Sequence, residues 1–110
     1  MVVYINNAFS SKMIVEKGLC TSFDFISEED FIEESHKEGV ISTIGHPDTA
    51  KMFNLKENRQ TVHLNEGDTL FVCELNNVAG TRLPVGITQL EEIPDGFSFR
   101  FLKIEVFKKP

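Results

Sequence analysis

The stretch Gly96–Phe107, "GFSFRFLKIEVF", decides the fold that this sequence predicts. Apolar and polar side chains alternate along most of it, which is typical of a β-strand that packs against a core. A basic tail, "KKP", follows it and ends the alternation. We therefore expect the longest strand of the domain in this stretch.

The segments that precede this strand predict the rest of a sheet. Short strands are expected at 1–5 ("MVVYI") and 21–26 ("TSFDFI"). The segments 60–64 ("QTVHL") and 68–75 ("DTLFVCEL") flank a turn that carries Gly67, so we expect them to form an antiparallel hairpin. The apolar segment "VISTI" is too short for its pattern to separate strand from loop.

An acidic stretch, 27–38 ("SEEDFIEESHKE"), predicts a helix with a solvated outer face. Ser27 is expected to cap its first turn, and Gly39 to end it in a left-handed conformation. Phe31 and Ile32 are expected to face inward. With a second helix after Pro47, the order of elements predicts a mixed sheet of about five strands with helices packed against it.

Length and composition place this fold in one domain, residues 1–110, of the α/β class at the border with α+β. The net charge of −6 argues against binding of long nucleic acid, which requires a basic face. The sequence shows no apolar run of membrane-spanning length and no secretory signal, so we expect a cytoplasmic protein that does not bind membranes. Cys20 and Cys73 lack metal-ligand spacing, so we expect free thiols, no metal and no cofactor.

His46 stands where chemistry is most expected, between Gly45 and Pro47 in "VISTIGHPDTAKMF". Pro47 fits the first position of a helix that runs to about Leu55, which makes His46 the cap residue. The N–H groups of the first turn, at residues 48–50, are then expected to point outward and attract an anion. A plain structural cap is the alternative.

The other histidines and the three arginines give weaker signals. His36 is expected to be a solvated residue of the acidic helix, and His63 to lie on the polar face of the hairpin. Arg100 alternates with phenylalanines, which indicates an outward, structural position. Arg82, in a Gly/Pro-rich loop, and Arg59, before a predicted strand, suit a phosphate clamp or a plain surface position.

Four segments, taken in chain order, resemble one family: "YINNAFS" (Tyr4–Ser10), "STIGH" (Ser42–His46), "NR" (Asn58–Arg59) and "RLPVG" (Arg82–Gly86). The combination is similar to the viral ring nucleases, which are anti-CRISPR proteins of type III immunity. The resemblance implies a compact α/β homodimer that binds cyclic tetra-adenylate. It also implies cleavage of that ring, without a metal, into linear di-adenylates.

The resemblance further implies that His46 is the catalytic group, with Arg82 beside it. The ligand-binding residues expected from the resemblance and its flanking positions are Asn7, Ala8, Phe9, Ser10, Ser11, Gly45, Arg59, Arg82, Leu83 and Pro84. Val85 departs from the family pattern, which commonly has an acidic residue there. A protein that holds the cyclic nucleotide without rapid turnover is therefore the alternative function.

Overall fold

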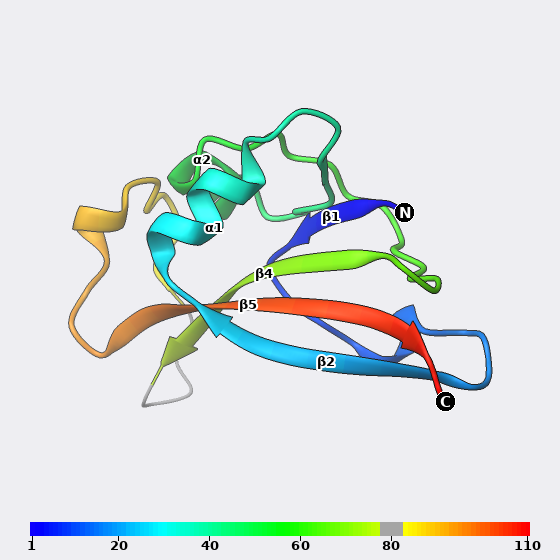
Figure 1. Ribbon diagram of the computed structural model, residues 1–110. Coiled ribbons are helices and arrows are strands. Elements are labelled where there is room, and N and C mark those ends of the chain that lie inside the picture. Colours follow the sequence, from blue (N-terminus) through cyan, green and yellow to red (C-terminus); the bar gives the residue numbers. More distant parts are fainter. Residues whose placement is uncertain (78–82) are drawn as a thin grey trace.

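The structure, a computed structural model, describes residues 1–77 and 83–110. Its elements, in chain order, are β1 (Val3–Asn6), the 3-10 turn η1 (Ser11–Met13), β2 (Leu19–Ile26), α1 (Glu28–Ser35), β3 (Ile41–Ser42), α2 (Pro47–Met52), β4 (Thr69–Asn77), the 3-10 turn η2 (Leu90–Glu92) and β5 (Phe97–Lys108). Within these residues, five strands form one sheet in the order β2-β5-β4-β1-β3 (Figure 1). The pairs β1–β3 and β1–β4 are parallel, and β4–β5 and β2–β5 are antiparallel. The predicted mixed sheet of about five strands with helices against it is confirmed, in an α+β arrangement.

β5 is the longest strand, as predicted, and its apolar side chains change face halfway along it. Phe99 and Phe101 pack on the side of the sheet that carries the helices. Further along, Ile104 and Val106 are buried on the opposite side. Because successive side chains of a strand point to opposite faces, this shift shows that each face is covered over a different half of β5.

The helices cover the first of these faces (Figure 1). Phe31 of α1 is fully buried, and its ring lies 5.3 Å from that of Phe53, just after α2, and 5.1 Å from that of Phe101 in β5. Ala50 of α2 is buried in the same cluster. This aromatic cluster fixes both short helices to the sheet.

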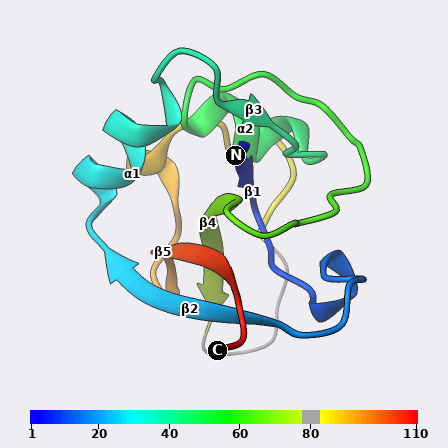
Figure 2. The same ribbon diagram turned by 45° about the vertical axis from the view of Figure 1, so that its right-hand side comes forward.

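The opposite face is covered by two irregular segments. The chain around η1 contributes Met13 and Ile14, and the long connection between α2 and β4, green in Figure 2, contributes Val62 and Leu64. The Leu64 N–H donates to the carbonyl of Met13 at 2.8 Å, which joins the two segments. The predicted hairpin strand at 60–64 is therefore wrong. The pattern alternates because the side chains of Val62 and Leu64 are buried against the sheet while their neighbours are exposed. The segment does not pair with β4.

Both helices are shorter than predicted. α1 ends at Ser35 rather than at Gly39, and the ring of His36 lies beyond it with Nδ1 2.8 Å from the Ile32 carbonyl and Nε2 3.0 Å from the Asn54 carbonyl. His36 is thus exposed, as predicted, but tied to the backbone. α2 ends at Met52 rather than near Leu55, because Asn54 has a φ of 52°, outside the helical region.

Two side-chain predictions for α1 have different outcomes. Ser27 caps the helix, with its hydroxyl oxygen accepting from the N–H of Asp30 at 3.0 Å, and Phe31 is buried, as predicted. Ile32 is 36% exposed, so its predicted inward position is wrong. Among the described residues, α1 has eight residues and α2 has six. Neither helix is long enough to cross a bilayer.

Candidate functional site

The parallel strands β1, β3 and β4 bring the predicted site segments to one edge of the sheet. The carboxyl ends of β1 and β3 lie side by side, whereas β4 continues past Val72, the partner of Asn6, to Asn77. Residues 7–11, 43–46 and 83–86 follow these three strands in the chain. The Thr43 N–H and hydroxyl both donate to the Ile5 carbonyl at 2.7 Å, which extends this alignment past β3. Ligands bind at this edge in sheets with parallel strands, so the topology supports a common site.

His46 caps α2 with its ring. Nδ1 accepts the Thr49 N–H at 3.3 Å and also lies 3.2 Å from the Thr49 hydroxyl, while the side chain of His46 is exposed. Nδ1 therefore faces the helix. Nε2, the opposite nitrogen of the ring, has no hydrogen-bond partner within residues 1–77 and 83–110. The predicted cap is confirmed, and it fixes which nitrogen is available to a ligand.

The capping arrangement also corrects the expected anion site. The Thr49 N–H donates to the His46 ring, and the Ala50 N–H donates to the His46 carbonyl at 3.0 Å. The prediction that both groups point outward to an anion is therefore wrong. α2 has only six residues, so little helix dipole remains to attract one.

Arg59 lies against the chain immediately before His46. Its Nη2 donates to the Gly45 carbonyl at 3.4 Å, and a Cβ at Gly45 would lie only 3.1 Å from Nε of Arg59. Gly45 thus leaves the space through which the arginine side chain passes. The structure brings together Gly45, His46 and Arg59, three of the predicted site residues.

The segment 83–86 is held beside the start of α2. The N–H of Gly86 donates to a carboxylate oxygen of Asp48 at 2.9 Å, and Gly86 has a φ of 92°, which favours glycine. Leu83 is half-buried, whereas Pro84 and Val85 are exposed. Arg82, the other predicted catalytic residue, lies outside the described residues, as do residues 78–81 of the preceding loop.

The segment 7–11 divides into packed and exposed positions. The Phe9 ring packs edge-on against Phe23 of β2, with centroids 5.4 Å apart, so Phe9 anchors the segment. The hydroxyl oxygen of Ser10 caps η1 by accepting from the Lys12 N–H at 3.3 Å. The backbone N–H of Asn7, which is partly buried, donates to the side chain of Asn6 at 2.8 Å. Ala8 and Ser11 are exposed, so this segment has accessible positions beside its anchor.

Sequence reasoning missed two residues that hold this site together. Asp48 ties the segment 83–86 to α2, and Thr49 contacts the catalytic candidate. Thr49 stands three residues after the cap, where a capping box has Glu or Gln, so no sequence pattern indicates its contact with a histidine cap.

Neither cysteine is a nucleophile candidate at this edge. Cys73 lies in β4 and its thiol donates to the Asn6 carbonyl at 3.7 Å. Burial raises the pKa of Cys73 to about 12, so the thiol stays protonated and unreactive at neutral pH. Both Cys20 and Cys73 are free, as predicted. In the described part of the chain, no group of three or more His, Cys, Asp or Glu side chains has the arrangement of a metal site.

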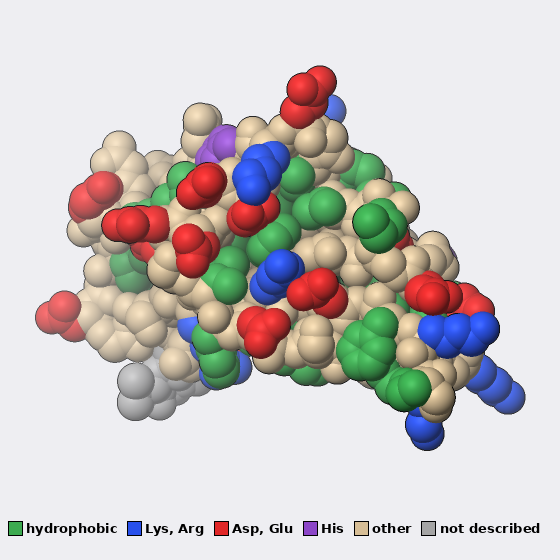
Figure 3. Space-filling view, in the orientation of Figure 1, with side chains coloured by type: hydrophobic (Ala, Val, Ile, Leu, Met, Phe, Trp, Pro, Cys, Tyr) green, Lys and Arg blue, Asp and Glu red, His purple; other side chains and the backbone are tan. Residues whose placement is uncertain are grey.

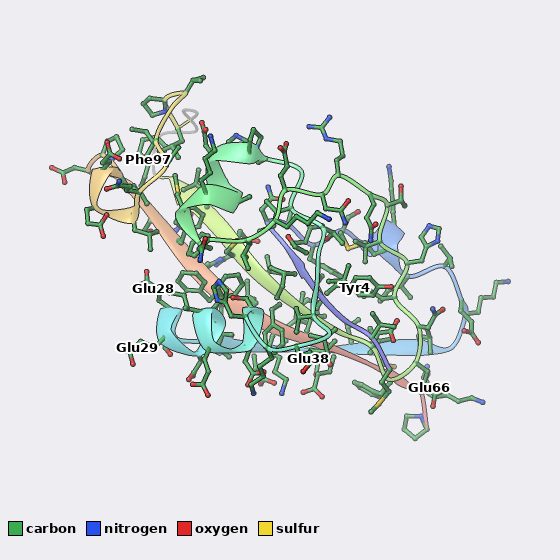
Figure 4. All side chains as sticks on the ribbon, turned by 90° about the horizontal axis from the view of Figure 1, so that it is seen from above. Tyr4, Glu28, Glu29, Glu38, Glu66 and Phe97 are labelled. Carbon is green, nitrogen blue, oxygen red and sulfur yellow. The ribbon has the colours of Figure 1, made fainter. Side chains whose placement is uncertain are left out.

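The acidic side chains of α1 and one cavity lie away from His46. Figure 3 shows acidic residues gathered over α1, and Figure 4 shows Glu28 and Glu29 projecting outward from its amino-terminal end. A cavity of about 390 Å³ lies between the end of α1, β3 and the chain after α2, where Ser42, Lys56 and Asn58 line it. His46 is not among the residues that line this cavity.

Comparisons with known proteins agree with this fold. The sequence matches a protein family described as STIV B116-like over residues 3–101. A solved structure, B116 of Sulfolobus turreted icosahedral virus (STIV), is similar with a TM-score of 0.77 and 28% identity, covering 96% of this chain and 99% of that chain. No curated protein matches the sequence. The similarity to a viral protein confirms the viral character of the resemblance, while the nuclease activity stays a prediction.

Proposed function

The chain belongs to the STIV B116-like family, and from this premise we propose that it is a ring nuclease acting in the cytoplasm of an infected host. Its substrate is cyclic tetra-adenylate, and its products are linear di-adenylates, so that it counteracts type III CRISPR immunity. The observation that carries the proposal is the exposed ring of His46, fixed through Nδ1 at the carboxyl ends of the parallel strands, with Arg59 against Gly45.

The chemistry uses the ribose of the substrate as the nucleophile. The 2′-oxygen attacks the adjacent phosphorus and forms a new P–O bond, while its proton passes to solvent. The bond from phosphorus to the 5′-oxygen breaks, and Nε2 of the protonated His46 gives its proton to that oxygen. This leaves a 2′,3′-cyclic phosphate and a 5′-hydroxyl, so the atoms and charges balance. General-acid catalysis of this kind contributes about 10²–10⁴-fold.

Arg59 supplies the positive charge that this transition state requires. Its guanidinium has five N–H donors in a planar fork, which suits two phosphate oxygens at once. Arg82 is proposed to add a second guanidinium. The net charge of −6 favours a small cyclic nucleotide over a long nucleic acid, because only local cations are then needed.

We propose that two copies form the working unit through the sheet face opposite the helices. Phe23 and Phe25 of β2 are 53% and 72% exposed there, although aromatic rings of this size favour burial. The Arg100 guanidinium lies 5.7 Å from the centre of the Phe25 ring. Phe9, from the site segment, packs on Phe23, so the exposed rings connect directly to the site. A two-fold pair would present two His46 rings to opposite phosphates of a four-nucleotide ring.

One observation favours a second candidate function, sequestration of the same ligand. Val85, where the family pattern commonly has an acidic residue, is 98% exposed beside α2. If that acidic residue helps align the reacting groups, its absence leaves binding intact and slows cleavage.

The deciding experiment incubates excess protein with labelled cyclic tetra-adenylate in the presence of EDTA. We expect single-turnover conversion to di-adenylates, and a rate that falls as pH rises and the imidazolium form is lost. His46→Ala should abolish most cleavage while binding remains, because a proton donor acts mainly in the transition state. His63→Ala, at another exposed histidine, is the matched control and should cleave normally. Tight binding without turnover would establish sequestration, and a strict need for a divalent ion would contradict the mechanism.

A further inference from the structure

Thr49 is the residue that faces the His46 ring from inside α2. Its side chain is 7% exposed, and its hydroxyl oxygen lies 3.2 Å from Nδ1. That ring nitrogen is its hydrogen-bond partner among the residues that the structure describes. Thr has a stiff χ1 because it is branched at Cβ, so the hydroxyl is held in this position.

The backbone N–H and the hydroxyl of Thr49 each pair with a different protonation state of the His46 ring. The Thr49 N–H only donates, so it pairs with a bare Nδ1, and the neutral ring then carries its proton on Nε2. When the ring takes up a second proton, Nδ1 becomes an N–H and faces that backbone donor. Of the two Thr49 groups beside Nδ1, only the hydroxyl oxygen can accept this proton.

We infer that Thr49 is a positioning residue that holds the His46 ring in its orientation while Nδ1 is protonated. This inference rests on the proposed function, in which the imidazolium gives its Nε2 proton to the leaving 5′-oxygen. The ring then remains neutral with its proton on Nδ1, a form that the backbone cap cannot hold. The hydroxyl therefore supports the ring both before and after proton transfer.

The charged groups around the ring do not replace this hydroxyl. The carboxylate of Asp48, on the same helix, accepts from the Gly86 N–H. The guanidinium of Arg59, on the packed connection, donates to the Gly45 carbonyl and has no acceptor to offer Nδ1.

The test compares Thr49→Val, which removes the hydroxyl and keeps the branched shape, with Thr49→Ser, which keeps the hydroxyl. In single-turnover cleavage of cyclic tetra-adenylate at neutral pH, Thr49→Val should be slower by about ten- to a hundredfold. The dissociation constant should stay within about twofold, because Thr49 is buried and its hydroxyl contacts the His46 ring. The pH–rate profile of Thr49→Val should move to lower pH, and Thr49→Ser should restore most of the rate. Thr49→Ala serves the same purpose if the valine variant does not fold.

A second measurement needs no substrate. NMR titration of the ligand-free protein should place the protonation midpoint of His46 at lower pH in Thr49→Val than in the wild type, with Thr49→Ser near the wild type. His63, in the same spectra, is the internal control and should not move. An unchanged His46 midpoint overturns the inference even if cleavage slows. If the His46 midpoint is lower in Thr49→Val than in the wild type but the wild type does not cleave, the contact is supported and only the proposed function is overturned. Equal cleavage by wild type and Thr49→Val overturns the catalytic part of the inference.

Discussion

Gly45 and Arg59 show how one missing side chain shapes the site. A Cβ at Gly45 would lie 3.1 Å from Nε of Arg59 and 3.3 Å from its Cβ and Cγ. Such contacts force a shift of the arginine, whose guanidinium is positioned by the Gly45 carbonyl. The glycine is therefore needed for the position of a cation rather than for its own backbone conformation.

Removal of this cation gives a prediction about affinity. Arg59→Ala should weaken binding of cyclic tetra-adenylate by about 1.5–3 kcal/mol, the usual contribution of hydrogen bonds to charged groups. Gly45→Ala should weaken binding in the same direction because it displaces Arg59. Lys56→Ala removes an exposed cation from the same connection and should leave affinity nearly unchanged. Isothermal titration calorimetry measures all three, and equal losses for Arg59→Ala and Lys56→Ala would show that only overall charge matters.

The residues of the site could be predicted from the sequence only in part. Gly45, His46 and Pro47 predict a capped helix start, and the structure confirms it. The pairing of Nδ1 with Thr49 was not predictable, because capping preferences describe oxygen acceptors and give no rule for a ring nitrogen. The contact between Asp48 and Gly86 joins residues 38 positions apart, a distance over which local patterns carry no information.

At the scale of elements, the change of face within β5 gives a prediction about stability. Phe101 is 6% exposed and contacts the rings of Phe31, Phe53 and Phe99, so Phe101→Ala leaves a cavity in the core under the helices. The free energy of unfolding should fall by about 3–5 kcal/mol. Phe107, on the same strand, is 43% exposed, and Phe107→Ala should lower it by less than about 1 kcal/mol. Urea denaturation measures the difference, and equal losses would contradict this assignment of the core.

The strands could be predicted wherever a sequence pattern is compatible with only one kind of structure. The strands at 3–6, 19–26, 69–77 and 97–108 all lie where alternation or apolar runs predicted them, within a few residues. The failure at 60–64 has a physical cause, since a segment that crosses a sheet face buries every second side chain just as a paired strand does. Only the hydrogen bonds differ, and the Leu64 N–H goes to Met13 instead of a neighbouring strand.

At the scale of the whole molecule, the exposed rings of β2 predict the state of association. Phe25→Ser should convert the proposed dimer to a monomer, because it places a polar group at the centre of the apolar contact. Phe107→Ser, at an exposed phenylalanine of the neighbouring strand on the opposite sheet face, is the matched control and should leave the dimer intact. Size-exclusion chromatography with light scattering measures the mass. A wild-type monomer, or a Phe25→Ser dimer, would rule out this face as the interface.

The position of β5 between β2 and β4 has a consequence for how the protein is made. On the ribosome, β5 is synthesised after the four other strands, yet it is the strand that joins β2 to the rest of the sheet. Until it leaves the exit tunnel, β2 has no neighbour, and both halves of the core lack the side chains that β5 supplies. The nascent chain therefore keeps its apolar segments exposed until translation of this region is complete. Folding is then a single late event rather than a stepwise one along the chain.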